Sequence, residues 1–345
     1  MRAAVLKEYR QPLAIEEVPD PEVPRDGVVL KVIACGVCRS DWHGWVGEHP
    51  RVKPGQIGGH EYCGEVIAAG PDAQYAVGDR LVAPFILSCG TCPQCRSGAS
   101  NTCLDQRLPG FVEPGAFAEY VAVPRDHNLA RLPEGLSPTV AAGLGCRVTT
   151  SWHALTDRAA LKGGEWLAVH GTGGIGLSAA LLGKALGARV VVVDVVQEKL
   201  DHALSLGIDA AVMAGDDVGA RIKDLTGGGA HVSVEALGIP ATVNGSLQCL
   251  RPLGRHVQVG LPTGHTARME VDMSAVYQGN LALFGTRGMP AWRYPSLLSM
   301  ITSGAVDMSP MIAREVGLSD VSAELAAFDG PTTPPGVAIV TDFAA

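Results

Sequence analysis

Four cysteines lie close together in the first third of the chain. Cys89, Cys92, Cys95 and Cys103 form the spacing C-x₂-C-x₂-C-x₇-C. Four thiolates at this spacing close a tetrahedron around Zn²⁺ and leave no position for a substrate, which is the ligand set of a structural zinc site. Unrelated thiols are the alternative. Because a closed site does no chemistry, we expect it to hold a loop that has few apolar residues to anchor it.

A second set of metal-ligand types indicates catalysis. Cys38 stands in C-G-V-C-R-S-D, His60 in G-G-H-E, and Cys146 in G-C-R-V-T-T. Two thiolates and an imidazole suit a zinc that keeps one position open, and zinc there lowers the pKa of a bound alcohol. Each residue alone is also an ordinary core Cys or a satisfied polar His. Cys35 with Cys38 forms a redox-type C-x-x-C, although no thioredoxin-like βαβ pattern surrounds it.

A glycine-rich turn follows an apolar run at 166–169. Gly171, Gly173 and Gly176 form a G-x-G-x-x-G motif that opens a predicted helix. Glycines there allow a tight turn and close approach of the backbone to a pyrophosphate. A second apolar run ends at Asp194, 18 residues after Gly176, where a carboxylate would accept from a ribose diol and repel a 2′-phosphate. This predicts NAD in preference to NADP; a surface Asp after an ordinary turn is the alternative.

Composition bounds the class of protein. The 345 residues include 43 Gly and 23 Pro, but 47% are hydrophobic, so the chain is neither collagen-like nor disordered, and its length suits two domains. The net charge of −8, without a Lys or Arg block, excludes a duplex-binding surface. No apolar run reaches about 18 residues, and Lys7 interrupts any signal-peptide pattern. We expect a soluble cytoplasmic protein without nucleic-acid or membrane partners.

The secondary-structure elements that must position these residues follow two different sequence patterns. Up to about residue 135 the chain reads as short strands between turns, the pattern of a barrel-like sheet, and helix is scarce. From about residue 149, apolar runs alternate with helical stretches, which is typical of a doubly wound parallel sheet. A last β-like run at 337–341 is expected to rejoin the first domain.

The expected strands are at 2–6, 13–18, 28–34, 63–69, 79–84 and 118–123, and then at 166–170, 189–193, 211–213, 232–236, 256–259 and 281–284. The expected helices are at 175–186, 197–206, 216–225, 240–250 and 293–303.

These motifs resemble those of the zinc-dependent medium-chain alcohol dehydrogenases. G-H-E-Y-C-G-E at 59–65, with Gly70 further on, is similar to the family's zinc motif. The four-cysteine lobe, Cys146 and the glycine motif follow in the family's order over nearly the whole chain. The resemblance implies an α/β fold with a GroES-like β-barrel catalytic domain at 1–148 and 289–345 and a Rossmann doubly wound NAD-binding domain at 149–288. It also implies two zinc ions per chain, one catalytic and one structural.

Metal-site roles carry over by position. The resemblance implies that Cys38, His60 and Cys146 bind the catalytic zinc. Glu61 would stand behind that zinc, and Asp41 would orient His60, the support that metal ligands generally need.

Proton-relay and cofactor roles also follow from the resemblance. Ser40 would take the alcohol proton and His43 would be the base at the solvent end; a helix-capping Ser and a surface His are the alternatives. The cofactor positions are Arg39 for the pyrophosphate, Thr150, Ile175 and Val259 for the nicotinamide, Lys199 over the adenosine, and Gly171, Gly173, Gly174, Gly176 and Asp194 for the dinucleotide turn and ribose.

Two positions bear on the branch of the family. Where the family usually has Gly-Arg or Gly-Lys near the last strand, whose cation helps hold the pyrophosphate, this chain has Gly336-Val337, so we expect cofactor binding to depend more on Arg39. The third ligand is Cys146, where the polyol-oxidising branch commonly has Glu. This favours the alcohol dehydrogenase branch.

Pocket residues predict the size of the substrate. By position, the aromatic residues that would approach it are Trp42, Trp45, His49, Phe85 and Phe111. Because relatives that act on ethanol have a bulky Trp where this chain has His49, we expect room for larger or secondary alcohols and aldehydes.

The predicted function is that of an NAD- and zinc-dependent alcohol dehydrogenase or carbonyl reductase. It would act on a small alcohol, aldehyde or ketone, as a homo-oligomer for which the resemblance favours a tetramer over a dimer. Two alternatives stand beside it. Zinc-free quinone or enoyl reductase chemistry on the same fold predicts lost zinc ligands, and a non-catalytic dehydrogenase-like structural protein predicts vestigial sites.

Overall fold

The computed structural model describes residues 1–330 and 336–345, which form two compact units. Unit 1 comprises Met1–Thr149, Gly288–Ser303 and Met311–Ala345, and unit 2 comprises Thr150–Arg287 and Gly304–Pro310. Among the described residues, no helix has the length and apolar character needed to cross a membrane.

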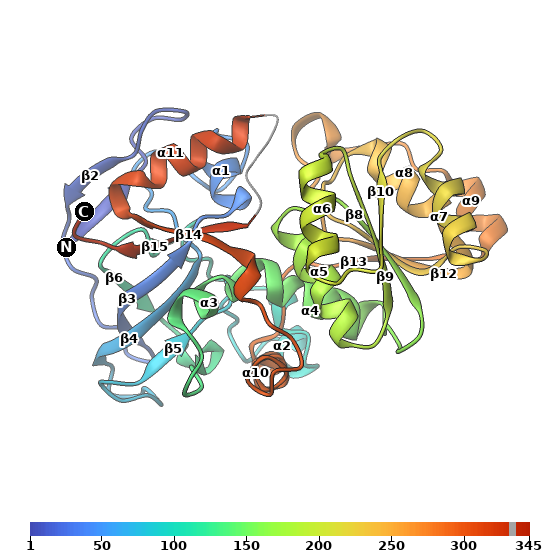
Figure 1. Cartoon of the computed structure of the whole chain (residues 1–345). Coiled ribbons are helices and arrows are strands. Elements are labelled where there is room, and N and C mark those ends of the chain that lie inside the picture. Colours follow the sequence, from blue (N-terminus) through green and yellow to red (C-terminus); the bar gives the residue numbers. More distant parts are fainter. Residues whose placement is uncertain (331–335) are drawn as a thin grey trace. The chain divides into compact units, whose positions relative to one another are not determined.

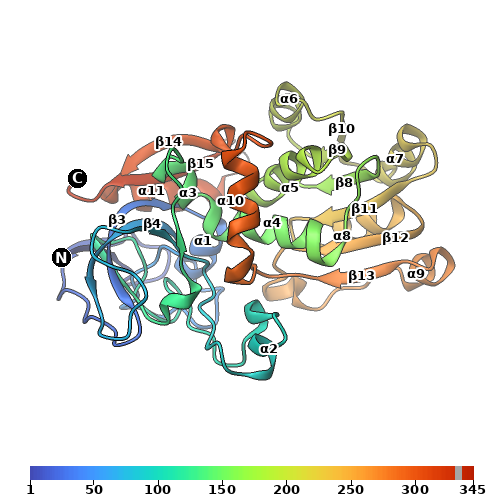
Figure 2. The same cartoon turned by 90° about the horizontal axis from the view of Figure 1, so that it is seen from below.

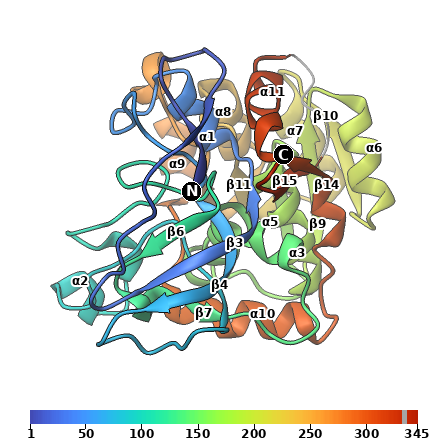
Figure 3. The same cartoon turned by 90° about the vertical axis from the view of Figure 1, so that its left-hand side faces the viewer.

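Unit 1 is built around strand β3 (Val28–Gly36). It pairs antiparallel with β4 (Glu61–Ala69) along its length (Figure 3). It also pairs with β6 (Tyr120–Val123) near its start and with β15 (Val337–Asp342) near its end, so the last β-like run rejoins this unit as expected. The other strands of the unit are β1 (Arg2–Val5), β2 (Ala14–Glu17), β5 (Arg80–Val82), β7 (Ala130–Arg131) and β14 (Ile312–Gly317).

The core of unit 1 is formed by the inward side chains of β3 and β4. Leu30 and Val32 are buried with Tyr62 and Val66 in one apolar cluster. Period-2 alternation on paired strands brings such residues to one face. The rigid sheet therefore holds the strand ends, which carry the chemistry-bearing residues.

Helix α1 (Arg39–Trp45) directly follows the end of β3. Helix α11 (Val321–Ala326) packs against it. The indole N–H of Trp45 donates to the carbonyl of Gln11 at 2.7 Å, and that of Trp42 donates to Asp329 at 3.1 Å. Two buried aromatic anchors thus fix α1. The remaining helices of unit 1 are α2 (Pro93–Arg96), α3 (Pro138–Ala142) and α10 (Tyr294–Thr302), and α4 (Thr149–His153) begins at the unit boundary.

Unit 2 is a six-stranded, fully parallel sheet in the order β10-β9-β8-β11-β12-β13, which is the Rossmann order. Helices α5 and α6 lie on one face and α7 and α8 on the other (Figure 1). The strands are β8 (Trp166–His170), β9 (Arg189–Asp194), β10 (Ala210–Met213), β11 (Ala230–Glu235), β12 (Leu250–Gln258) and β13 (Ala282–Gly285). The helices are α5 (Gly174–Ala185), α6 (Gln197–Ser205), α7 (Val218–Thr226), α8 (Pro240–Gln248) and α9 (Met273–Gly279).

Most predicted elements are present with ends within two residues of those expected. The predicted start of β12 at residue 256 was wrong, because the strand begins at Leu250. The prediction missed its first half because Pro252, Leu253, which has a positive φ of 63°, and Gly254 break the apolar pattern. Two strands were missed. β7 has two residues, and β14 is an edge strand that carries Arg314 and Glu315.

Candidate functional site

Cys38, His60, Glu61 and Cys146 gather in unit 1. One potential ligand atom of each lies within 4.8 Å of the others, and all four residues are buried. The structure therefore brings together the three predicted zinc ligands with Glu61. Cys35, the other member of the C-x-x-C, is buried in β3 and is not part of this group.

Asp41 links two members of the cluster. Its Oδ1 accepts from Nδ1 of His60 at 2.9 Å and from the N–H of Gly59 at 3.1 Å, and its Oδ2 accepts from the N–H of Cys38 at 3.0 Å. A carboxylate that accepts from Nδ1 fixes the tautomer of a histidine and leaves Nε2 as a ligand. This contact suits the orienting role predicted for Asp41, and Asp41 also caps the helix that follows Cys38.

The cluster fits a zinc ion. Nε2 of His60 is buried and has no hydrogen-bond partner among the described residues, and a buried unsatisfied polar atom costs about 1–3 kcal/mol. The neighbouring thiol of Cys146, with Arg147 and His60, lowers the pKa of Cys38 well below its usual value. The same contact and burial raise the pKa of Cys146. Thiolates and an unpartnered imidazole are the donors that zinc prefers.

Glu61 contacts the backbone beside the third ligand. Its Oε1 accepts from the N–H groups of Cys146 and Arg147, both at 3.0 Å, and its Oε2 accepts from the Arg147 guanidinium at 2.5 Å. Burial raises the pKa of Glu61 to about 7, and Arg147 opposes that shift. Sequence reasoning did not identify Arg147, whose partner Glu61 is 86 residues away in the sequence.

The predicted relay residues share helix α1. Ser40 is half-buried in its first turn, and Nδ1 of His43 lies 2.8 Å from Oε2 of Glu48. Arg39 is exposed, with its guanidinium 4.7 Å from the Trp42 ring. The placement of these side chains suits a relay that begins beside Cys38, but the roles themselves stay predictions.

Two of the five predicted pocket aromatics contact His60, and a third, His49, stacks on one of them. The Phe111 ring lies 4.6 Å from the His60 ring and 4.7 Å from that of His49, and Phe85 meets His60 edge-on at 5.9 Å. Trp42 and Trp45 instead anchor α1, with both indole N–H groups engaged as described above.

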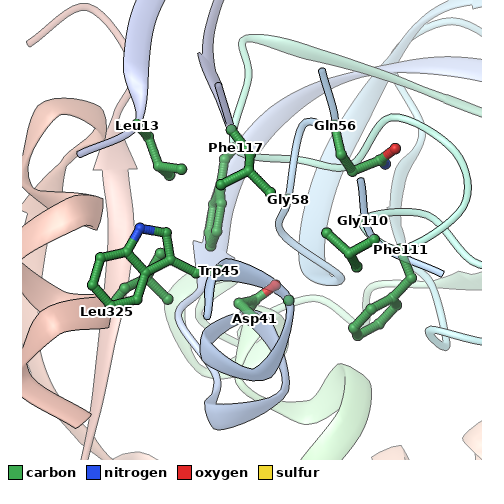
Figure 4. Close-up of a pocket in the computed structure, with 12 residues that line it drawn as sticks. Leu13, Asp41, Trp45, Gln56, Gly58, Gly110, Phe111, Phe117 and Leu325 are labelled. Carbon is green, nitrogen blue, oxygen red and sulfur yellow. The ribbon is translucent and has the colours of Figure 1, made fainter. Parts of the chain in front are cut away.

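A small cavity of about 30 Å³ lies in unit 1 beside Asp41 (Figure 4). Trp45, Phe111, Phe117 and Leu325 are among its apolar lining residues. Because this surrounding is apolar, the hydrogen bond between Asp41 and His60 is electrostatically stronger than it would be in water.

The four-cysteine lobe forms a second cluster in unit 1. The potential ligand atoms of Cys89, Cys92, Cys95 and Cys103 lie within 4.8 Å of one another, and the Sγ atoms of Cys92 and Cys95 are 3.4 Å apart. N–H groups of Thr91 and Cys92 donate to Sγ of Cys89, and the hydrogen bonds from Thr91 lower the pKa of Cys89 to about 5. The lobe, with α2, stands clear of β3 and β4 (Figure 2). Four convergent thiols fit a structural zinc.

The glycine motif of unit 2 forms the turn from β8 into α5. A Cβ on Gly176 would lie 1.7 Å from the carbonyl oxygen of Gly171, and Gly171 has a φ of +93°. These two glycines are required by the turn itself. A Cβ on Gly173 would have nothing within 4 Å, so that side of the turn is open, as a pyrophosphate site requires.

Asp194 lies at the end of β9, as predicted. Its carboxylate accepts from Thr172 on the glycine turn and from the N–H groups of Val195 and Val196. Sequence reasoning did not identify Thr172, although its position between two glycines of the motif could have indicated a role for its hydroxyl in the turn. The other predicted cofactor residues of unit 2 lie in or beside these elements: Gly174 and Ile175 at the start of α5, Lys199 in α6, Val259 after β12 and Thr150 in α4.

A GroES-like sheet unit with two cysteine-containing clusters and a Rossmann unit with a glycine turn define a zinc-type dehydrogenase. The chain matches the alcohol dehydrogenase GroES-like domain over residues 24–134 and the zinc-binding dehydrogenase family over residues 174–303. It belongs to the zinc-dependent medium-chain alcohol dehydrogenase family. It is therefore an oxidoreductase of a family that uses NAD(P) and zinc.

Known relatives differ in their named substrates. An alcohol dehydrogenase of Geobacillus stearothermophilus is 38% identical over 267 residues, which are 76% of this chain and 78% of the relative. An L-threonine 3-dehydrogenase of Saccharopolyspora erythraea is 33% identical over 91% of this chain and 92% of its own length. The solved structure of an alcohol dehydrogenase from Thermus sp. ATN1 has a TM-score of 0.91 and 29% identity, over 99% of this chain and 100% of that chain.

Proposed function

We propose that this protein is an NAD-dependent alcohol dehydrogenase or carbonyl reductase. Cys38, His60 and Cys146 would hold a catalytic zinc, and the four-cysteine lobe would hold a structural one. The observation that carries the proposal is the buried Cys₂His group, in which Nε2 of His60 lacks a partner among the described residues while Asp41 holds Nδ1.

When bound, zinc supplies a Lewis acid that lowers the pKa of an alcohol, and NAD⁺ accepts the hydride. The chain's own residues handle the proton. The Ser40 hydroxyl would accept the proton of the substrate hydroxyl, and His43, paired with Glu48 and linked to Ser40 through the cofactor ribose, would pass it to solvent. For each alcohol oxidised, the residues of α1 would thus carry one proton to solvent.

The proposed substrate is an apolar alcohol, aldehyde or ketone, with room for secondary or larger groups. Phe85 and Phe111 form an apolar wall around His60, and His49 stacks on Phe111. These contacts supply no cationic cluster for a phosphate or a carboxylate. An alcohol is therefore favoured over an amino acid of the kind named for the L-threonine relative.

NAD is proposed as the cofactor because Asp194 ends β9 with an acceptor carboxylate. No Arg stands beside it in the sequence to offset the charge of a 2′-phosphate. Lys199 would lie over the adenosine.

A homo-oligomer in the cytoplasm is also proposed. Strand β13 has a partner strand only on one side, β12, among the described residues. The side chains of Met273 and Tyr277, in the adjacent α9, are largely exposed, at 60% and 85%. An open sheet edge with apolar neighbours favours self-association. Nine cysteines without a disulfide among the described residues suit a reducing compartment.

The deciding experiment compares Cys146→Ala with Cys103→Ala. We expect about two zinc ions per wild-type chain and turnover of NAD⁺ with a panel of primary, secondary, aromatic and cyclic alcohols. Cys146→Ala should lose one zinc and turnover at a nearly unchanged Tm. Cys103→Ala should lose one zinc and lower the Tm, because structural zinc contributes folding free energy.

Near-normal kcat in Cys146→Ala would overturn the assignment of the third ligand. One zinc per wild-type chain without turnover would favour a non-catalytic protein. Zinc-independent reduction of an activated C=C bond would favour the quinone or enoyl reductase alternative.

A further inference from the structure

An ion pair that the proposed chemistry does not use is buried beside the Cys38, His60 and Cys146 group. Nη2 of Arg147 lies 2.5 Å from Oε2 of Glu61, and the two side chains are 5% and 0% exposed. Desolvating such a pair costs several kcal/mol per ion, so burial alone gives little reason to keep it. Its contacts indicate another role.

The guanidinium of Arg147 connects the chain neighbours of all three proposed ligands. It donates to Glu61, which directly follows His60, and to the carbonyl of Val37 at 3.0 Å, which directly precedes Cys38. Arg147 itself directly follows Cys146. One rigid planar group therefore joins three segments that are far apart in sequence, and a guanidinium is suited to this because its donors have a fixed geometry.

Glu61 completes the connection through the backbone. Its Oε1 accepts from the N–H groups of Cys146 and Arg147, which lie in the π-helical turn Leu144–Val148. Turns of this type are frequent at functional sites. The carboxylate thus ties the start of β4 to the turn that carries Cys146, and so sets the spacing between that residue and His60.

Two glycines confine the Glu61 side chain. A Cβ on Gly36 would lie 2.9 Å from its Oε2, and a Cβ on Gly145 would lie 3.1 Å from its Cα. The first of these distances leaves no room for a side chain without a shift. The backbone of Gly36 thus lies close to the carboxylate and that of Gly145 close to the Glu61 backbone, while Arg147 and the two N–H groups hold the carboxylate oxygens.

Arg147 is also connected to the start of β15 through Val37. Val37, which accepts from Arg147, donates its N–H to the carbonyl of Ala338 at 2.9 Å, and Ala338 is the residue after Val337. Unit 1 therefore has a buried cation close to the start of β15, supplied by a different part of the chain.

We infer that Arg147 is a positioning residue for the proposed catalytic metal, acting through Glu61 and Val37 on the spacing of Cys38, His60 and Cys146. This inference rests on the proposed function, since it presumes the metal at that group. It makes Arg147 neither a ligand nor a contact of the substrate.

The test measures metal retention in Arg147→Met, with Arg147→Lys as the conservative variant. We expect Arg147→Met to release the metal of this site to a chelator about 10–100-fold faster than wild type, as for loss of other residues that support ligands. Metal content should fall from two ions per chain to one, because the four-cysteine lobe keeps its own. The visible spectrum of the Co²⁺-substituted protein should shift, because the geometry of the thiolate ligands changes.

Three variants serve as comparisons for Arg147→Met. Arg147→Lys should release the metal at an intermediate rate, because an ammonium keeps the charge, but its shorter stem and freely rotating donors do not hold the two contacts that Nη2 makes. In the double variant Glu61→Gln/Arg147→Met, the loss of metal retention should be smaller than the sum of the losses in the two single variants. A loss that is less than additive is expected because Arg147 acts through Glu61. Arg255→Met breaks the Arg255–Glu165 pair of unit 2 and should leave metal retention unchanged.

Wild-type release rates and an unshifted Co²⁺ spectrum in Arg147→Met would overturn the inference. If that variant does not fold, Arg147→Lys decides, and a wild-type rate there overturns it equally. Wild-type protein that holds metal only in the four-cysteine lobe would instead refute the proposed function, so the two failures are distinguishable.

Discussion

Thr172 and Asp194 join the glycine turn of unit 2 to the end of β9. The hydroxyl and the N–H of Thr172 donate to Oδ2 of Asp194 at 2.6 and 2.8 Å. Oδ1 accepts from the N–H groups of Val195 and Val196 at 2.9 and 3.1 Å. Four donors converge on one carboxylate, so the proposed ribose acceptor and the proposed pyrophosphate turn move as one piece.

Asp194→Ala is expected to lower kcat/KM for NAD by about 10²-fold, because it removes the acceptor for two ribose hydroxyls. Use of NADP should fall much less. Thr172→Val is the matched control: it keeps the carboxylate and loses about 1 kcal/mol of stability with the hydrogen bond, but should keep the preference for NAD. Steady-state kinetics with both cofactors measure this. Wild-type turnover of NADP within a few-fold of NAD would refute the role of Asp194.

Alanine substitutions at two glycines of the same turn should affect different properties, stability in one case and cofactor binding in the other. Gly176→Ala forces a Cβ to within 1.7 Å of the carbonyl oxygen of Gly171, so we expect a loss of at least about 3 kcal/mol in the free energy of unfolding. Gly173→Ala has open space in the absence of cofactor. It should keep the wild-type Tm but bind NAD about tenfold more weakly or worse, because the backbone approaches the pyrophosphate there. Thermal unfolding and NADH fluorescence titration separate the two, and wild-type NADH affinity in Gly173→Ala would contradict the placement.

Ser40→Ala should lower alcohol oxidation by about 10²–10⁴-fold, the range for loss of a general acid–base group. His43→Ala should lower it less and mainly at neutral or lower pH, where hydroxide is scarce. Ser40→Thr, which keeps the hydroxyl, is the control and should retain most of the activity. The pH–rate profiles of the variants provide the measurement; profiles identical to wild type in both alanine variants would remove the two residues from the mechanism.

Acid should weaken unit 2 through His256. Nδ1 of this buried ring lies 2.9 Å from Oγ of Ser246, and burial lowers the pKa of His256 to about 4, against about 6.5 in an unfolded chain. Between these values the unfolded chain binds a proton that the folded chain does not. The stability is therefore complete above pH 6.5 and falls as the pH decreases toward 4, by up to about 1.4 kcal/mol per pH unit.

His256→Asn should reduce that slope, whatever its effect on stability at pH 7. Denaturant unfolding between pH 6.5 and 5 provides the comparison. The exposed His127→Asn, in unit 1, is the control and should keep the wild-type slope. An unchanged slope in His256→Asn would mean that the buried ring does not govern acid sensitivity.

Local pattern was sufficient to propose the ligands but not to find the residues that position them. Cys38, His60 and Cys146 could be proposed because each stands in a short motif of chemically distinctive residues. Arg147 could not be assigned a role, because its contacts with Glu61 and Val37 span 86 and 110 residues of sequence. No periodicity encodes such a contact. The same holds for β12, whose early start depends on pairing with β11 rather than on its own apolar pattern.

The pairing of β15 with β3 has a consequence for synthesis. Val37, next to Cys38, receives its partner Ala338 only when the end of the chain has emerged from the ribosome. Most of unit 2 is one continuous stretch and can fold earlier, although domains usually fold in order from the N-terminus. Completion of the unit 1 sheet, and with it of the backbone contacts beside Cys38, is then a late event in synthesis.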